Sequence, residues 1–479
     1  MIVFWTLYLA SLALLPVAIT KKKKPAASVA WLLAIAFIPI LGGLLFLTFG
    51  TDRIVNKGRK KLFSNEELEK QLRRIESEWA PVVEDSASAE KLPDALDNIR
   101  VVARKFGLFD TLGRNKVTLL IDAEEIYNKM EQAILQAKDH INLEYYIFEP
   151  DAVGLRFRDL LIKKAREGVR INFLYDAVGS IHLGWSRKFL APLREAGVEP
   201  IDFMPLRTFF QPWNMNLRNH RKIMVIDDEI AFTGSLNIGE DFICENDKGG
   251  KRWRETHVMI EGPAVAQLQW VFCEDWYFAT GEELLNDHYF HKVKAAGDHI
   301  LQVVPGGPDV REAAISKAIV TAVSQAQAKI YLTTPYFIPD APLDMALQLA
   351  ALHGADVRII VPKKSDHPYV ALAGRSYYED LLHAGVRIFE YDAGFIHAKM
   401  LVIDEQFTVI GSANTDLRSF GYNFEANVHM YDRSLALQAE EIFLNDLSNC
   451  KEIEETHFLK RPARARFAEN FCRLFSALM

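Results

Sequence analysis

The apolar positions of this chain are distributed unevenly, and the longest apolar runs stand at its start. Met1–Thr20 is apolar apart from hydroxyl-bearing residues, and residues 25–50 contain no charged side chain. Runs of these lengths predict helices that cross or enter a bilayer, the second more comfortably than the first. A cleaved signal peptide is the alternative for the first run, but that run lacks a basic start and a second one follows at once. We therefore predict two transmembrane or membrane-embedded helices over residues 1–50 and a charged connector over residues 51–100.

Beyond the connector, short β-branched runs alternate with helical stretches, and the pattern occurs twice. Leu135–Asp151 aligns with Ser324–Asp340, and each segment reads as the end of a helix followed by a strand. Such alternation is typical of α/β units with a mainly parallel or mixed sheet. At about 190 residues each, the repeats have the size of domains and not of solenoid units. We predict the first repeat over residues 101–290 and the second over residues 291–479.

Each repeat carries the same string of polar residues inside an apolar strand. Both copies obey the pattern His-x-Lys-x4-Asp-x6-Gly-Ser-x-Asn without a gap. The polar side chains are His220, Lys222, Asp227, Ser235 and Asn237 in the first copy and His397, Lys399, Asp404, Ser412 and Asn414 in the second. Alternation along a strand places the histidine and the lysine on one face. A lone histidine in a strand is most often a core or surface residue, but two copies matching at fixed positions favour a functional site.

These residue types suit chemistry at phosphorus. A neutral imidazole can attack phosphorus, and a protonated one can donate a proton near neutral pH. Lysine supplies positive charge for the non-bridging phosphate oxygens, and the serine hydroxyl and asparagine amide supply further donors. Phosphodiester transfer needs a nucleophile on one side and an acid on the leaving oxygen. Two copies facing each other across a pseudo-two-fold axis would provide both.

The doubled motif resembles that of the phospholipase D superfamily, whose two repeats build one site between them. The resemblance implies an α/β fold of two pseudo-symmetric phospholipase D-like α/β/α sandwich repeats that share one active site, preceded by the hydrophobic helical hairpin. The hairpin and several looser strings also resemble bacterial cardiolipin synthases, over essentially the whole chain. These strings are Leu143-Glu-Tyr-Tyr-Ile-Phe, Asn216-Leu-Arg-Asn-His-Arg-Lys, Pro305-Gly-Gly-Pro-Asp and an ending that begins Arg473-Leu-Phe-Ser.

The resemblance implies phosphatidyl transfer between two phosphatidylglycerol molecules, which gives cardiolipin and free glycerol through a phosphohistidine intermediate. The lysines, serines and asparagines of both motifs would bind the substrate and stabilise the negative charge of the transition state. By analogy, Glu255 and Glu425 would sit on the strand after each motif and orient the histidines. Asp227 and Asp404, although part of the catalytic motif, are expected to fix local geometry, because their carboxylates would repel phosphate. No metal or other cofactor is implied.

The two motifs differ in ways that suggest separate roles for the histidines. His220 is flanked by Arg218 and Arg221, whose charge would favour a neutral imidazole and attract phosphate. His397 is followed by Ala398 and has a shorter approach segment. We therefore predict that His220 carries the phosphatidyl group and that His397 is the acid and base.

Charge bears on rival substrates. Residues 1–61 hold nine basic residues and one acidic residue, which leaves 47 basic and 62 acidic residues in the remainder. A nucleic-acid groove normally shows an excess of basic residues, so we expect no nucleic-acid partner, although a local basic groove inside an acidic body would support a membrane-anchored nuclease. A hydrolytic phospholipase D, with water as the acceptor, stays open as the main alternative. A catalytically silent membrane scaffold is the weakest one.

Partners and location follow from the resemblance. It implies phosphatidylglycerol and anionic membrane lipids as partners, with association into a homo-oligomer left open. It also implies a multi-pass protein of the bacterial inner membrane with its catalytic body on the cytoplasmic face. The positive-inside rule does not decide the orientation, because four lysines lie between the apolar runs and five basic residues follow the second. A re-entrant first segment is the alternative topology.

Two flanking segments bear on a lipid substrate. The aromatic stretch 208–215 before the first motif could hold acyl chains or dip into the membrane interface, or it could simply cover the core. The C-terminal stretch 459–479 is basic and amphipathic, with Phe467, Phe471 and Phe475 four residues apart. It could lie on anionic headgroups, or pack on the body or on a partner subunit. The four cysteines show no metal-like spacing and fit reduced thiols of an internal compartment.

Overall fold

The computed structural model describes residues 2–20, 25–47, 92–205, 217–243, 253–284, 289–290, 294–308 and 313–476. Most of the predicted connector, the aromatic stretch before the first motif and Cys244 lie outside the described residues. The predicted boundaries of the domains stay predictions.

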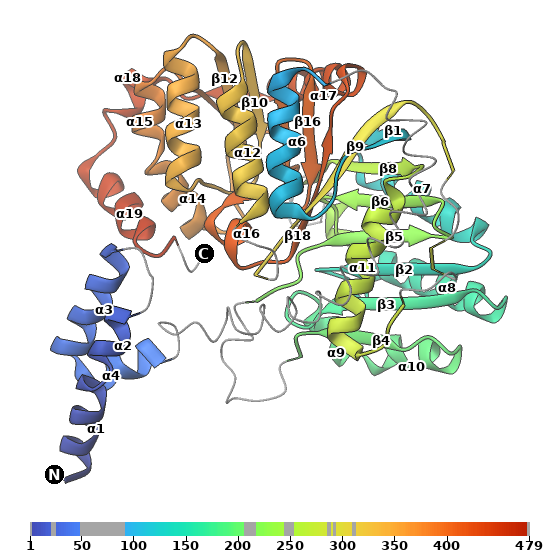
Figure 1. Ribbon diagram of the computed structural model, residues 1–479, viewed down its shortest axis with the longest axis horizontal. Coiled ribbons are helices and arrows are strands. Elements are labelled where there is room, and N and C mark those ends of the chain that lie inside the picture. The colour runs from blue at the N-terminus through green and yellow to red at the C-terminus, as the bar shows by residue number, and fades with distance from the viewer. Residues whose placement is uncertain are drawn as a thin grey trace.

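One mixed sheet of 15 strands runs through the α/β body (Figure 1). Its strands in the first half are β1 (Leu112–Leu120), β2 (His140–Tyr145), β3 (Arg170–Asp176), β4 (Pro200–Phe203), β5 (Lys222–Ile226), β6 (Ile230–Gly234) and β8 (His257–Glu261). Those in the second half are β9 (His299–Gly306), β10 (Lys329–Thr333), β12 (Asp356–Pro362), β13 (Arg387–Tyr391), β15 (Met400–Ile403), β16 (Phe407–Gly411), β18 (Glu425–Met430) and β19 (Cys450–Glu452). Two further pairs of short strands join β7 (Trp253–Arg254) to β14 (Phe395–Ile396) and β11 (Phe337–Ile338) to β17 (Thr415–Asp416).

The order of the strands reveals the duplication. It runs β19-β13-β12-β10-β15-β16-β18-β9-β1-β8-β6-β5-β2-β3-β4, so the seven strands from β1 outward to β4 correspond one by one to those from β9 outward to β13, and β19 is an additional strand of the second half. In each half, three strands pair in parallel and the motif strand, β5 or β15, pairs antiparallel with both of its neighbours. The halves meet where β1 and β9 pair antiparallel. This order confirms the two pseudo-symmetric α/β repeats that the sequence predicts.

Helices cover both faces of the sheet. In the first half they are α6 (Asp94–Gly107), α7 (Ala123–Gln136), α8 (Ala152–Arg166), α9 (Ile181–Trp185), α10 (Arg187–Glu195), the 3₁₀ helix η3 (Glu240–Phe242) and α11 (Val265–Thr280). In the second half they are α12 (Ala314–Gln325), α13 (Ala341–Leu352), α14 (Pro368–Arg375), α15 (Tyr378–His383), α16 (Leu417–Gly421), α17 (Arg433–Leu447), α18 (Glu455–Phe458) and α19 (Ala463–Arg473). Although α6 lies just before β1 in the chain, its buried side chains pack with those of α12 in the core of the second half.

The burial of the motif strands explains why each reads as an unbroken apolar run. In β5, Ile223 and Val225 face the core that α11 and α17 share, whereas Met224 and Ile226 face the core beneath α7 and α8. A strand covered on both faces has no solvent-facing side and therefore shows no alternation of polar residues.

The apolar N-terminal segment is helical, as predicted, but each of its two runs is interrupted. They form α1 (Ile2–Leu12), α2 (Leu15–Thr20), α3 (Pro25–Phe37) and α4 (Pro39–Leu45). Proline at the start of α2 and of α4 lacks the backbone donor that would continue the preceding helix. In the part of the chain that the structure describes, no helix combines the length and the apolar character that a membrane crossing needs. Figure 1 shows these four helices standing off from the α/β body.

Candidate active site

Each motif histidine lies just before its motif strand and contacts the other half of the protein. The backbone N–H of His220 donates to the carbonyl of Phe424 at 2.9 Å. The backbone N–H of His397 donates to the carbonyl of Arg254 at 2.8 Å, where β14 and β7 pair in parallel. The residue after each of these carbonyls is a glutamate, so the backbone pairing delivers a carboxylate of one half to the histidine of the other.

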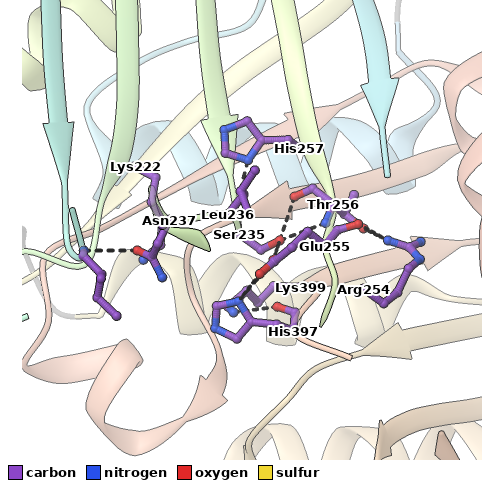
Figure 2. A network of polar contacts seen from close by, with 12 residues as sticks. Lys222, Ser235, Leu236, Asn237, Arg254, Glu255, Thr256, His257, His397 and Lys399 are labelled. Carbon is purple, nitrogen blue, oxygen red and sulfur yellow. Dashed lines mark hydrogen bonds and ion pairs between the residues drawn. The ribbon is translucent and has the colours of Figure 1, made fainter. Parts of the chain in front are cut away.

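The two His–Glu pairs are therefore crossed between the halves. Nδ1 of His220 lies 2.9 Å from Oε2 of Glu425, at the start of β18. Nδ1 of His397 lies 2.8 Å and 3.1 Å from the two carboxylate oxygens of Glu255, between β7 and β8 (Figure 2). An ionised carboxylate at this position fixes the tautomer that carries its proton on Nδ1. This leaves Nε2 of each imidazole as the nitrogen for chemistry, and neither half holds a complete pair of its own.

Ser235 and Ser412, predicted to bind substrate, lie behind the glutamates and donate to them. Oγ of Ser412 donates to Oε2 of Glu425 at 2.5 Å, and Oγ of Ser235 donates to Oε2 of Glu255 (Figure 2). Each hydroxyl also accepts the backbone N–H of the residue that follows its glutamate, at 2.8 Å and 3.0 Å. Both serines are fully buried. The geometry therefore assigns them the positioning of the carboxylates.

Lys222 and Lys399 are buried next to the histidines. Nζ of Lys222 donates to the backbone carbonyl of His220 at 2.7 Å, and Nζ of Lys399 donates to that of His397 at 2.6 Å. Burial lowers the pKa of Lys222 to about 7 and the pKa of Lys399 to about 8, and the charge of Lys399 contributes to the lowering at Lys222. The two ammonium groups thus share one site, and a bound phosphate anion would favour the charged form of both.

Burial also controls the histidines. It lowers the pKa of His220 to about 4 and lowers the pKa of His397, against the opposing effect of the paired carboxylates. For Glu255 and Glu425, burial acts to raise the pKa but is outweighed by the histidines and lysines, so the pKa of each carboxyl is lowered. At neutral pH the site holds neutral imidazoles and ionised carboxylates before an anionic substrate enters.

The motif asparagines lie buried beyond the ends of the strands that follow β5 and β15. Oδ1 of Asn237 accepts the backbone N–H of Ile147 at 3.2 Å (Figure 2). The backbone N–H of Asn414 donates to Oγ of Ser419 at 3.2 Å, and its Oδ1 has no hydrogen-bond partner among the described residues. Their role as donors to substrate stays a prediction.

Asp227 and Asp404 lie at the far end of the motif strands. At about 3.3 Å per residue, the strand separates each of them from its histidine by about 20 Å. Both have a positive φ, of 53° and 51°. Their carboxylates accept three successive backbone N–H groups at 2.7–2.9 Å, those of Lys138, Asp139 and His140 in the first half and of Gln327, Ala328 and Lys329 in the second. These hydrogen bonds tie the start of β2 and of β10 to the motif strand and fix the local geometry there.

A buried polar cluster supports the first motif alone, and the sequence analysis did not identify it. Nη1 of Arg221 donates to Asp275 at 2.5 Å, and its Nε donates to the backbone carbonyl of Glu425 at 3.0 Å. The side-chain amide of Asn219 donates to Glu144 at 3.1 Å and to Asp275 at 3.2 Å. Burial, and then the charge of Asp275, raises the pKa of Glu144 well above its ordinary value. The cluster therefore ties the first motif to the backbone that carries Glu425.

The arginines beside His220 consequently have a different role from the predicted one. Nη1 of Arg218 lies 3.1 Å from Oδ1 of Asp176, and both side chains are buried. Because Arg218 and Arg221 are each paired with an aspartate, they add little net charge at the imidazole. The neutral state of His220 comes from its burial instead. Ala398 in place of Arg221 was the one signal in the sequence of this difference between the halves.

Aromatic rings cover both imidazoles. The ring centroid of Tyr146 lies 4.8 Å from that of His220, and the centroid of Trp253 lies 5.1 Å from that of His397. Both are edge-on contacts, which orient the imidazoles and limit their contact with water. Neither residue was identified from the sequence.

Two α/β repeats that contribute a lysine and a histidine each to one site, with crossed His–Glu pairs, define a phosphoryl-transfer site of the phospholipase D type. The phosphatidylserine synthase of Haemophilus influenzae Rd KW20, known from its crystal structure, shares this fold with a TM-score of 0.56 at 14% sequence identity. The match covers 80% of this chain and 100% of that one.

Sequence comparison identifies the family. The family model described as "Cardiolipin synthase, PLD-like domain" matches residues 130–276 and 319–447, and one described as "Phospholipase D-nuclease N-terminal" matches residues 5–50. The cardiolipin synthase of Geobacillus kaustophilus is 38% identical over 463 residues, which are 96% of this chain and 90% of the relative. Cardiolipin synthase 1 of Bacillus anthracis is 36% identical over 485 aligned positions, which cover 100% of this chain and 93% of the relative. The chain belongs to the cardiolipin synthase family of the phospholipase D superfamily.

Proposed function

We propose that this protein is a phosphatidyltransferase that makes cardiolipin from two molecules of phosphatidylglycerol and releases glycerol. The observation that carries the proposal is the crossed pair of His–Glu couples, His220–Glu425 and His397–Glu255, in a chain of the cardiolipin synthase family. Two imidazoles in one site provide a nucleophile and an acid for the same phosphodiester.

In the first half-reaction, Nε2 of His220 attacks phosphorus and a P–N bond forms. His397 takes up a proton on Nε2 as the anionic substrate binds, and when the P–O bond to glycerol breaks this proton passes to the departing glycerol oxygen. In the second half-reaction, the terminal hydroxyl of another phosphatidylglycerol attacks the phosphohistidine. His397 takes the proton of that hydroxyl, the P–N bond breaks, and cardiolipin and neutral His220 result, as microscopic reversibility requires.

The fixed groups of the site stabilise the charge that develops in both steps. Lys222 and Lys399 face the added negative charge on the non-bridging oxygens, with Asn237 and Asn414 as further donors. Glu425 stabilises the positive ring of the phosphohistidine, because Nδ1–H stays hydrogen-bonded to it. Burial lowers the pKa of His397, and the charge of Glu255 opposes that lowering and so favours the protonated form.

Negative charge on the side of the second motif supports this assignment of roles. The charges of Asp366 and Asp416 act on Lys399 to raise its pKa, after the larger effects of burial and of the two glutamates. Of the charges with the largest effects on the pKa of Lys222, one, that of Asp176, belongs to an aspartate. A more negative surrounding favours a protonated imidazole at His397, which suits the acid, over His220, which suits the nucleophile.

The products distinguish this function from its alternative. Incubation of the purified protein with phosphatidylglycerol labelled in both the glycerol headgroup and the acyl chains, in detergent, should yield labelled cardiolipin and free glycerol in equal amounts. Formation of phosphatidic acid without cardiolipin would instead identify a hydrolytic phospholipase D. The acidic balance of the chain after residue 61 argues against a nuclease.

Activity should persist in an excess of EDTA, because Lys222 and Lys399 supply the positive charge that the phosphoryl oxygens need. Among the described residues, no group of three or more His, Cys, Asp and Glu side chains could hold a metal ion. The measurement is cardiolipin formation with and without chelator, with added Mg²⁺ as the control. Loss of activity that a divalent ion restores would contradict a mechanism built on lysine.

The N-terminal helices would hold the catalytic body at the cytoplasmic face of a bacterial inner membrane, where phosphatidylglycerol is present. Deleting residues 1–50 should leave the site folded, because α1–α4 contribute no residue to it. Activity on micellar or short-chain phosphatidylglycerol should then survive better than activity on bilayers. Equal losses on both substrates would mean that these helices stabilise the fold.

A further inference from the structure

The C-terminal helix α19 and the turn that follows it present a stripe of large apolar side chains to solvent. Phe467 is 73% exposed, Phe471 51%, Leu474 78% and Phe475 44%. Their spacing of three and four residues places them on one face of the segment. The ring centroids of Phe467 and Phe471 lie 6.2 Å apart and those of Phe471 and Phe475 5.4 Å apart, so the stripe is continuous.

The opposite face of α19 is firmly held by the body. Cys472 and Glu469 are buried. Glu469 accepts from Arg461 at 2.8 Å and from Arg375 of α14 at 3.4 Å. The guanidinium of Arg473 lies 4.3 Å from the ring centroid of Tyr377. These contacts fix the rotation of α19 about its own axis. The aromatic stripe therefore faces solvent because the opposite face is packed on the body.

Positive charge accompanies the stripe. Residues 459–476 hold five basic residues and one acidic residue, the buried Glu469. Arg464 is exposed and lies one turn before Phe467 on the same face of α19, and Lys460 is exposed just before the helix begins. An exposed aromatic face flanked by Lys and Arg matches the interface of a bilayer that contains anionic lipid.

The position of α19 links this surface to the active site. It packs against α14, where Arg375 donates to Glu469 at 3.4 Å. The loop that leads into α14 carries Asp366, which accepts from Tyr336 at 2.8 Å and whose charge acts on Lys399. In Figure 1, α19 lies on the side of the body where the apolar helices α1–α4 stand.

We propose that the aromatic face of α19 docks on an anionic phospholipid surface and holds the second-motif side of the active site against that surface. The proposal rests on the function proposed above and deepens it, because it specifies which face of the body turns toward the membrane that holds the lipid substrate. An apolar stripe covered by a second copy of the chain would not need flanking positive charge, and the position of the apolar helices α1–α4 on the same side of the body favours the membrane.

The test places a fluorescent reporter on the stripe. Full-length Phe471→Trp protein is reconstituted in vesicles of phosphatidylglycerol and phosphatidylcholine, with acyl chains that are either brominated or unbrominated. The matched control is Leu352→Trp, which alters a 65% exposed leucine at the end of α13. The active site lies at the ends of the strands from which α13 starts. Because α13 runs back along the strands, Leu352 lies near their other ends, at the start of β12. The emission of the unmodified protein, with its eight tryptophans, is subtracted from both.

Brominated lipid should remove emission from Phe471→Trp and leave that of Leu352→Trp unchanged. The loss should shrink in vesicles of phosphatidylcholine alone. Equal emission of Phe471→Trp in brominated and unbrominated vesicles would overturn the proposal, as would a spectrum of that variant that shifts with protein concentration in detergent, which would indicate a second copy. An inactive protein that also carries His220→Ala should give the same quenching, so a failure of the proposed chemistry and a failure of docking are separable.

A second measurement tests the consequence for catalysis. The triple variant Phe467→Ser/Phe471→Ser/Phe475→Ser should lose activity on phosphatidylglycerol vesicles by roughly tenfold or more, equivalent to about 1.4 kcal/mol of surface binding. Activity on phosphatidylglycerol in detergent micelles should stay at the level of the unmodified protein, since the stripe touches no residue of the site. Equal losses on vesicles and micelles would mean that the phenylalanines stabilise the fold, and unchanged activity on both would contradict docking.

Discussion

Replacing His220 by alanine should abolish the covalent phosphatidyl–enzyme, whereas replacing His397 should let that intermediate form slowly and persist. Without His220 no nitrogen is in place to form the P–N bond. Without His397 the departing glycerol oxygen receives no proton, and the next acceptor alcohol has no base. Each substitution should lower cardiolipin synthesis by at least the roughly 10²–10⁴-fold that is typical of general acid–base catalysis, and the loss should be larger for the nucleophile.

Intact-protein mass spectrometry after incubation with phosphatidylglycerol measures the adduct directly, with samples kept at alkaline pH because the P–N bond is labile in acid. The matched control is His182→Ala, since the His182 side chain is exposed and lies in neither motif. A phosphatidyl group found on His397 in the unmodified protein, or in the His220→Ala protein, would reverse the assignment of nucleophile and acid. An absence of any adduct in all variants, with cardiolipin still formed, would require direct transfer between the two lipids.

The parts of the site that can be predicted from the sequence are those that depend on residues close together along the chain. The two copies of the motif gave the histidines and lysines, and the apolar runs after them gave the buried strands β5 and β15. The duplication gave the two α/β halves. Each of these follows from side chains close together in the sequence, where the period of a strand fixes which residues share a face.

The parts that were missed depend on contacts between distant residues. Glu425 and His220 are 205 positions apart and Glu255 and His397 are 142 apart, so no local pattern could show that the pairs are crossed. The same holds for Asp275 of α11, which accepts a hydrogen bond from Arg221, 54 positions away in the sequence. The sequence suggests free positive charge at Arg218 and Arg221, because Asp176 and Asp275, the aspartates that pair with them, are far away along the chain. The interruptions of the N-terminal helices, in contrast, coincide with Pro16 and Pro39, which are visible in the sequence.

Substituting either active-site glutamate by glutamine should cost activity nearly as much as losing a histidine. Glutamine keeps the size and the acceptor oxygen but removes the charge that fixes the Nδ1–H tautomer and stabilises a positive imidazole ring. In a Ser-His-Asp triad, the corresponding loss of charge lowers kcat by about 10⁴-fold. Glu425→Gln should slow formation of the adduct, because it removes the counter-charge of the phosphohistidine. Glu255→Gln should slow the protonation of glycerol, because the pKa of His397 would fall further.

Crossed and uncrossed His–Glu pairings predict different rates of adduct formation in doubly substituted proteins. In a His397→Ala background, adding Glu255→Gln should change the rate of adduct formation little, because the partner of Glu255 is already gone. Adding Glu425→Gln in the same background should slow the adduct strongly, because its partner is the nucleophile. The coupling of residues in contact and the additivity of independent ones are both measurable from the four rates of each cycle. The reverse outcome, with Glu255→Gln harmful and Glu425→Gln silent, would mean that each histidine works with the carboxylate of its own half.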